Sequence, residues 1–187
     1  MKEYRSAIRS RNMIKKAFFD LLSHKSITEI TVVDVVNAAD ISRNTFYAHY
    51  NDVYAVLDEM ENDFIEKLNI YIGDNAEKIE NYSPLPLFLK VARFIEADAE
   101  SGGLFLINPN PVAFYEKIKE VLYNHIMNSI NCEEIKDECG FNTFLECLTS
   151  GFMNLCKKCL TGEISASTED LSNEIAAIYT CGVSLYL

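Results

Sequence analysis

The chain has 187 residues, 49% of them hydrophobic and 24% charged, a composition typical of a globular protein with a substantial core. No stretch of about 18 apolar residues occurs, so we expect no membrane span. The basic N-terminus is not followed by the apolar segment of a signal peptide. We therefore expect a cytoplasmic protein whose six cysteines are reduced.

The formal net charge of −11 is unevenly distributed along the chain. Residues 1–50 carry a net charge of +3, whereas residues 51–187 carry −14. A basic head on an acidic body suits a protein that presents one end to a polyanion and repels it elsewhere.

The chain is predicted to be all-α, because apolar residues recur at spacings of three and four and no strand pattern occurs. A first helix is expected from about Ser6 to His24. Its first half holds a cluster of basic residues, which can add electrostatic affinity for a polyanion. These residues are Arg5, Arg9, Arg11, Lys15 and Lys16.

Two short helices are predicted next. Thr31 caps the second helix, and Asp34 three residues later gives a variant of the capping box. That helix ends near Asp40. Ser42 then caps a third helix that is expected to reach about Tyr50.

Longer helices are expected in the rest of the chain. The fourth runs from about residue 52 past Ile72, with an interruption near Gly73. Breaks are predicted at residues 82–86, 101–103 and 108–111. The helices that follow are expected at Leu87–Ala99, Val112–Ser129, about Glu133–Leu160 and about Thr168–Leu185. We expect two domains, 1–52 and 53–187, linked by the fourth helix.

Residues 31–50 have the pattern of a helix-turn-helix. A tight turn at residues 39–42 joins the two short helices, with Ile41 and Phe46 packed between them. Arg43 and Asn44 then point outward at the start of the third helix, where they can bond guanine and adenine edges in the major groove. Hydroxyl and imidazole groups nearby can bond phosphates. The candidate DNA-binding residues are Thr31, Ser42, Arg43, Asn44, Thr45, Tyr47 and His49.

The aromatic residues of this segment have an alternative role. Tyr47, His49 and Tyr50 can form an aromatic seam against the fourth helix without touching DNA. We expect Tyr50 and Phe46 to pack in this way.

The stretch ITEITVVDVVNAADISRNTFYAHYND closely resembles the DNA-binding domain of TetR/AcrR-type bacterial transcriptional regulators. The resemblance is strong over about residues 6–57 and weaker over 151–171. It implies a homodimer that binds a palindromic operator, more often as a repressor than as an activator. It also implies bodies that dimerise and often enclose a small-molecule effector. By the family's motif, phosphate contacts would come from Thr31, Ser42, Thr45, Tyr47 and His49, with Arg43 and Asn44 near bases.

Two positions depart from the family's pattern. Asp40 stands where the turn usually has glycine, and a left-handed conformation costs Asp less than most other residues. Val53, preceded by Asp52, stands where a lysine commonly holds a phosphate. The second departure motivates an alternative function: a coactivator or protein-interaction regulator that keeps the fold without binding DNA.

The last two helices carry apolar stripes that each include a glycine. Because glycine in a helix interior costs about 1 kcal/mol relative to alanine, we expect another helix to approach closely there. A four-helix interface between two chains explains the stripes, and packing within one chain is the alternative. The predicted interface residues are Phe144, Leu148, Gly151, Phe152, Leu155, Leu171, Ile175, Ile178 and Gly182.

The middle of the chain is rich in aromatic residues, which suit either an effector pocket or an ordinary core. These residues are Phe64, Tyr71, Tyr82, Phe88, Phe94, Phe105, Phe114, Tyr115 and Tyr123. His125, Arg93 and Asn124 are candidate polar contacts in such a pocket. Cys156 and Cys159 have metal-like spacing, but no second pair completes a zinc set, so we expect core thiols, no metal and no cofactor. No nucleophile–base pair, P-loop or dinucleotide motif occurs, so an enzyme is not expected.

Overall fold

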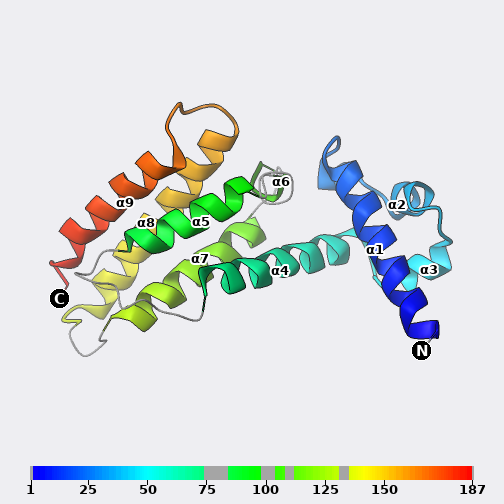
Figure 1. The fold of residues 1–187 in the computed structure, drawn as a ribbon, viewed down its shortest axis with the longest axis horizontal. Coiled ribbons are helices and arrows are strands. Elements are labelled where there is room, and N and C mark those ends of the chain that lie inside the picture. Colours follow the sequence, from blue (N-terminus) through cyan, green and yellow to red (C-terminus); the bar gives the residue numbers. More distant parts are fainter. Residues whose placement is uncertain (1, 74–83, 98–103, 108–111, 131–134, 187) are drawn as a thin grey trace. The chain divides into compact units, whose positions relative to one another are not determined.

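The structure is a computed structural model that describes residues 2–73, 84–97, 104–107, 112–130 and 135–186. All regular elements in these ranges are helical, as predicted (Figure 1). They fall into two compact units, which divide within α4 between Phe64 and Ile65. No helix in the described ranges is long and apolar enough to cross a membrane.

The first unit contains α1 (Lys2–Leu22), the 3₁₀ helix η1 (Ile27–Glu29), α2 (Val32–Ala38), α3 (Arg43–Tyr47) and the start of α4 (Val53–Ile72). Helices α1, α2 and α3 pack pairwise on one another. Their contact faces meet in a small core that excludes solvent completely. Its fully buried side chains include Ile14, Phe18, Val35, Phe46 and Val56.

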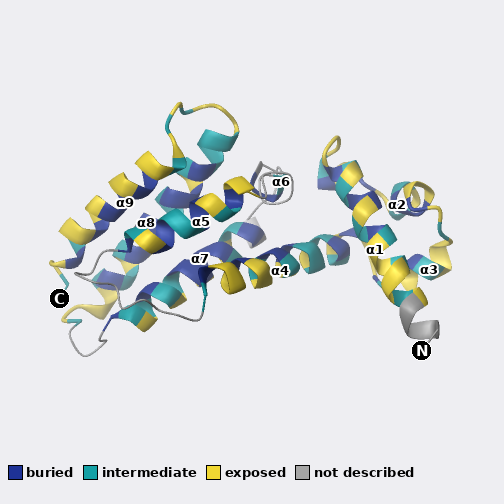
Figure 2. Ribbon diagram, viewed as in Figure 1, coloured by how far each residue is buried: buried dark blue, intermediate teal, exposed yellow. Residues whose placement is uncertain are grey.

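The second unit contains the end of α4 with α5 (Leu85–Ala97), α6 (Leu104–Ile107), α7 (Val112–Ser129), α8 (Glu138–Leu160) and α9 (Thr168–Val183). Helix α9 packs on α5 and α8, and α8 packs on α7. The buried faces of these helices point toward one another, and their exposed faces point outward (Figure 2). This is the bundle that the apolar periodicity predicts.

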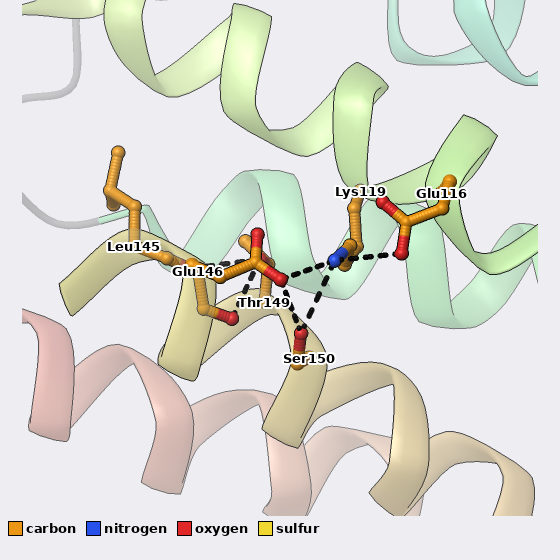
Figure 3. Close-up of polar contacts among 6 residues, drawn as sticks. All are labelled: Glu116, Lys119, Leu145, Glu146, Thr149 and Ser150. Carbon is orange, nitrogen blue, oxygen red and sulfur yellow. Dashed lines mark hydrogen bonds and ion pairs between the residues drawn. The ribbon is translucent and has the colours of Figure 1, made fainter. Parts of the chain in front are cut away.

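A polar cluster joins α7 to α8 (Figure 3). The Lys119 ammonium forms ion pairs with Glu146 across the helix contact and with Glu116 at 3.0 Å on its own helix. It also lies 3.5 Å from the Ser150 hydroxyl. Burial lowers the pKa of Lys119, but its hydrogen bonds to Glu146 and Glu116 outweigh burial, so the pKa lies above its ordinary value. The buried cation is therefore fully compensated, as its position requires.

Several boundaries differ from the prediction. Helix α1 begins at Lys2, α3 ends at Tyr47, and α8 begins at Glu138, where the Asp137 side chain accepts from the Gly140 backbone N–H. The two short helices η1 and α6 were not predicted, because three or four residues show no periodicity. The interruption near Gly73 is confirmed by its φ of 86°. The breaks at 101–103 and 108–111, and residues 82–83 of the first break, lie outside the described residues.

Candidate nucleic-acid interface

The turn between α2 and α3 fixes how the two helices meet. The Ile41 backbone N–H donates to the Val36 carbonyl at 3.1 Å, and that of Asp40 donates to the Asn37 carbonyl at 3.3 Å. These two bonds are the Schellman pattern, which satisfies helix-end carbonyls and needs a left-handed residue between them. Asp40 is that residue, with a φ of 51°. The prediction that Asp40 replaces glycine in the turn is confirmed.

Ser42 starts α3 as predicted. Its side-chain oxygen accepts from the Thr45 backbone N–H at 3.1 Å, and the two hydroxyls lie 2.9 Å apart. This cap satisfies one of the four free N–H groups at the start of the helix. Helix α3 therefore keeps a defined first turn although it spans only five residues.

The first residues of α3 present their side chains to solvent. Ser42, Arg43 and Asn44 are exposed, and Tyr47 has 56% of its surface exposed. Thr45 is half-buried. Beneath them, Phe46 is fully buried and holds the helix on the core of the first unit. The side chains that could enter a DNA groove therefore lie on a different face of α3 from Phe46, which anchors the helix.

The aromatic residues after the turn divide between the two predicted roles. Tyr50 is 4% exposed and its ring lies 5.9 Å from that of Phe46, so both pack inward as expected. Tyr47 instead points outward, with its ring edge-on to Phe46 at 5.7 Å. His49 is half-buried, and its ring lies 6.4 Å from that of Tyr50. Only part of the alternative aromatic seam is therefore present.

Thr31 is exposed but its hydroxyl is occupied. It donates to the Asp34 carboxylate at 2.6 Å, and the Asp34 backbone N–H donates back to it at 3.2 Å. The Thr31 backbone N–H also donates to the Asp34 carboxylate, at 2.9 Å. These two bonds to the carboxylate, with the positive charge of Lys25 nearby, hold the pKa of Asp34 below its ordinary value. The predicted capping box is confirmed, and a phosphate bonded by this hydroxyl would have to displace a carboxylate.

The basic residues of α1 are less available than the sequence predicted. Arg11 pairs with Glu59 of α4 at 2.6 Å, and Lys15 pairs with both Glu59 and Asp63 at 2.6 Å. The charge of these two residues is thus already paired within the chain, and the prediction that the basic half of this helix adds affinity for DNA stays a prediction. The sequence offered a signal for the pairing, since 11 and 15, like 59 and 63, are spaced by one helical turn.

The start of α4 shows what Asp52 and Val53 do in place of the phosphate-binding lysine of the family pattern. Val53 is 6% exposed and belongs to the core of the first unit. Asp52 accepts from the Ala55 backbone N–H at 2.8 Å and so caps α4. Both positions therefore serve the fold, and neither supplies a cation.

The predicted interface stripes of α8 and α9 belong largely to the core of a single chain. Leu148, Phe152, Leu171 and Ile175 are all buried there, and the Phe152 ring lies 4.7 Å from that of Phe88. Because these four side chains are covered within one chain, they fit the alternative of intrachain packing, and their place in a dimer interface stays a prediction.

The two glycines of the stripes differ. A Cβ on Gly182 would come within 2.5 Å of the Phe144 ring, so the close helix approach predicted there occurs within the chain. Gly151 has nothing within 4 Å of such a Cβ. Ile178 is 54% exposed, and Leu155 is half-buried. Gly151 and Ile178 thus remain on the surface of the second unit.

The candidates for an effector pocket mostly contact other residues of the chain. Phe88, Phe105 and Phe114 are buried, and the rings of the last two meet edge-on with centres 5.2 Å apart. Arg93 lies 3.9 Å from Glu169, and Asn124 is exposed. His125 is half-buried, and burial together with the positive charge of Lys90 lowers its pKa. Tyr82 lies outside the described residues.

The cysteine pair of α8 has the character of core thiols. Cys156 is 2% exposed, and burial, with smaller contributions from the neighbouring Cys159 and Glu96, raises its pKa to about 12. The Cys159 thiol donates to the Ala166 carbonyl at 3.4 Å. Metal binding requires thiolates, which this environment disfavours.

No family model matches the chain. The chain is 32% identical over 87 residues to the HTH-type dhaKLM operon transcriptional activator DhaS of Lactococcus lactis subsp. lactis, which covers 46% of this chain and 44% of that protein. The match thus spans less than half the length of this curated relative.

Solved structures match over nearly the whole chain. A TetR transcriptional regulator from Streptococcus agalactiae has a TM-score of 0.73 at 22% identity, covering 96% of this chain and 98% of its own. The dihydroxyacetone kinase operon activator DhaS has a TM-score of 0.58 at 18% identity, covering 95% and 97%. The chain therefore has the all-α fold of TetR-type transcriptional regulators. The resemblance predicted from the sequence is confirmed for the fold.

Proposed function

We propose that this protein is a sequence-specific DNA-binding transcriptional regulator that acts as a homodimer. The observation that carries the proposal is the surface of α3. Arg43, Asn44 and Tyr47 are exposed there, while Phe46 fixes the same helix to the core. A capped helix held in this way can place its first residues against base edges in the major groove.

The exposed side chains divide into two chemical classes. The Arg43 guanidinium suits a bidentate contact with guanine, and the Asn44 amide suits one with adenine. Ser42, Thr45 and Tyr47 offer hydroxyl groups of the kind that bond phosphate oxygens and set the register. We therefore assign base reading to Arg43 and Asn44 and positioning to the hydroxyl residues.

The dimer would form through the outer faces of α8 and α9. Gly151 leaves open space beside α8, and Ile178 exposes an apolar side chain on α9. Two copies of such a helix pair can form a four-helix interface with two-fold symmetry. A two-fold dimer would present two α3 helices to the two halves of a palindromic site.

The test is binding to the DNA upstream of the gene. Fluorescence anisotropy with that duplex and with a shuffled duplex, at physiological salt, should give an affinity for the first at least 10³-fold tighter, the lower end of specific recognition. Arg43→Ala should lose about 1–3 kcal/mol of that preference. Equal affinities for the two duplexes, with no effect of Arg43→Ala, would overturn the proposal.

A second candidate function is a regulator that acts through protein contacts without DNA. It is favoured by the start of α4, where buried Val53 and the capping Asp52 supply no cation for a phosphate. The pairing of Arg11 and Lys15 with α4 points the same way. Under this alternative the protein would alter transcription of a promoter in cells while showing no preference for any upstream duplex in vitro.

The sign of regulation needs a separate measurement. The Lactococcus relative is described as an activator, whereas the resemblance implies a repressor more often. A promoter–reporter fusion in strains with and without the gene separates the two. Lower expression without the gene indicates an activator, and higher expression indicates a repressor.

A further inference from the structure

The side chains that join α1 to α4 form a compact group of four charges. Glu59 bonds Arg11 through one carboxylate oxygen and Lys15 through the other, both at 2.6 Å, and Asp63 bonds Lys15 at 2.6 Å. We call these four residues the α1–α4 charge cluster. Its two positive and two negative charges cancel.

The cluster is neutral yet lies close to the end of α3. The Arg11 guanidinium lies 5.8 Å from the centre of the Tyr50 ring, and the His49 ring lies 6.4 Å from that of Tyr50. The Arg11 charge therefore lies beside Tyr50, just after the helix-turn-helix. A phosphate within the Debye length of about 8 Å at physiological ionic strength would feel this charge.

The pairing also holds at neutral pH. Burial raises the pKa of Glu59, but hydrogen bonds from Lys15 and Arg11 outweigh it, so the pKa lies below its ordinary value. Burial lowers the pKa of Lys15, and its bonds to Asp63 and Glu59 raise it above the ordinary value. Both shifts keep Glu59 and Lys15 charged at neutral pH, so a phosphate near Arg11 would also meet the Glu59 carboxylate.

We propose that Glu59 and Asp63 act as internal counter-charges that keep Arg11 and Lys15 from adding to DNA affinity. This inference rests on the proposed DNA-binding function and adds specificity-determining residues outside the helix-turn-helix. It means that non-specific affinity stays low, because the positive charge of α1 is partly neutralised before DNA arrives. Binding then depends mainly on α3 and its flanking caps.

The test is the salt dependence of binding to random duplex DNA. Each phosphate neutralised by a cation contributes about 0.9 to the slope of log affinity against log salt. Glu59→Gln releases Arg11 while Lys15 keeps Asp63, so the slope should steepen by about 0.9. Glu59→Gln combined with Asp63→Asn also releases Lys15, so the slope should steepen by about 1.8.

Two controls make the result specific. Glu66→Gln removes the same charge from an exposed position of α4 that has no ion pair to α1 among the described residues, and it should leave the slope unchanged. Arg11→Gln should also leave the wild-type slope unchanged but should abolish the gain in the Glu59→Gln background. This dependence on background identifies Arg11 as the released cation.

The outcomes separate the two proposals. The counter-charge role would be overturned if the Glu59→Gln variants gave the same slope as Glu66→Gln. It would also be overturned if they showed a lower thermal midpoint and weaker binding without a steeper slope, since the cluster would then be a structural ion pair. Absence of any preference for upstream DNA in the wild-type protein would instead overturn the proposed function. Circular dichroism spectra of all variants show whether each is folded.

Discussion

Substitution of Asp40 tests the physical account of the helix-turn-helix turn. Asp40 has a φ of 51° between the two Schellman hydrogen bonds that link α2 to α3. A left-handed conformation costs an L-residue about 1–2 kcal/mol, and Asp pays less than Ala or Val. Glycine pays no steric cost, but it loses about 0.5–1 kcal/mol through the greater freedom of the unfolded chain.

The expected order of stability is therefore Gly, then Asp, then Ala, then Val at position 40. Asp40→Gly should raise the free energy of unfolding by about 0.5 kcal/mol, the steric gain less the entropic loss. Asp40→Ala should lower it by about 0.5–1 kcal/mol, and Asp40→Val by about 1–2 kcal/mol because its branched Cβ is more crowded.

The assay is urea denaturation of the full chain, with amide hydrogen exchange at Ile41 as a local probe. The Ile41 N–H donates to the Val36 carbonyl across the turn, so its protection should follow the same order. Equal stability of the Gly and Val variants, or slower exchange at Ile41 in the Val variant, would refute the claim that backbone strain at this residue governs the turn.

Four further predictions concern other parts of the chain. Gly151→Leu should weaken the proposed dimer in sedimentation without unfolding the chain, because its Cβ meets nothing within 4 Å; an unchanged dimer would remove α8 from the interface. Gly182→Leu should instead destabilise the single chain by displacing Phe144, seen as a lower thermal midpoint. Cys156 should resist thiol reagents at pH 8 in the native protein, because its pKa is raised to about 12, whereas the exposed Cys147 should react. Peptide mass spectrometry distinguishes the two, and equal labelling would contradict the burial of Cys156. Glu59→Gln should lower the free energy of unfolding at pH 7. Because the folded state lowers the pKa of Glu59, its contribution is fully present above the ordinary glutamate pKa of 4.5 and is lost as pH falls below it, so the difference from wild type should shrink in acid. A difference in urea titrations that does not change with pH would contradict the ion pairs.

The helix-turn-helix could be predicted in detail from the sequence because its signals are local. The caps at Thr31 and Ser42, the inward side chains of Val35 and Phe46, and the left-handed Asp40 all appear as expected. Each depends on residues within four positions of one another, where helix geometry alone fixes the contact.

Features that depend on long-range packing were predicted less well. The stripe containing Leu148 and Phe152 was correctly identified as buried, but periodicity gives a face without naming what covers it. For the same reason Gly182 signalled a close approach without showing that Phe144 of the same chain makes it. Arg11 pairs with Glu59, 48 positions away in the sequence. The charge balance of residues 1–50 therefore treats Arg11 as a free positive charge, although the fold places it in a neutral cluster.

The most direct test of the account separates base reading from phosphate binding on α3. The measurement is the ratio of affinities for the upstream duplex and for random DNA, for wild type, Arg43→Ala and Tyr47→Phe at one salt concentration. The account predicts that Arg43→Ala lowers the ratio by roughly tenfold or more, while Tyr47→Phe weakens both affinities and leaves the ratio unchanged. A ratio that is unaffected by Arg43→Ala would contradict the claim that α3 reads sequence.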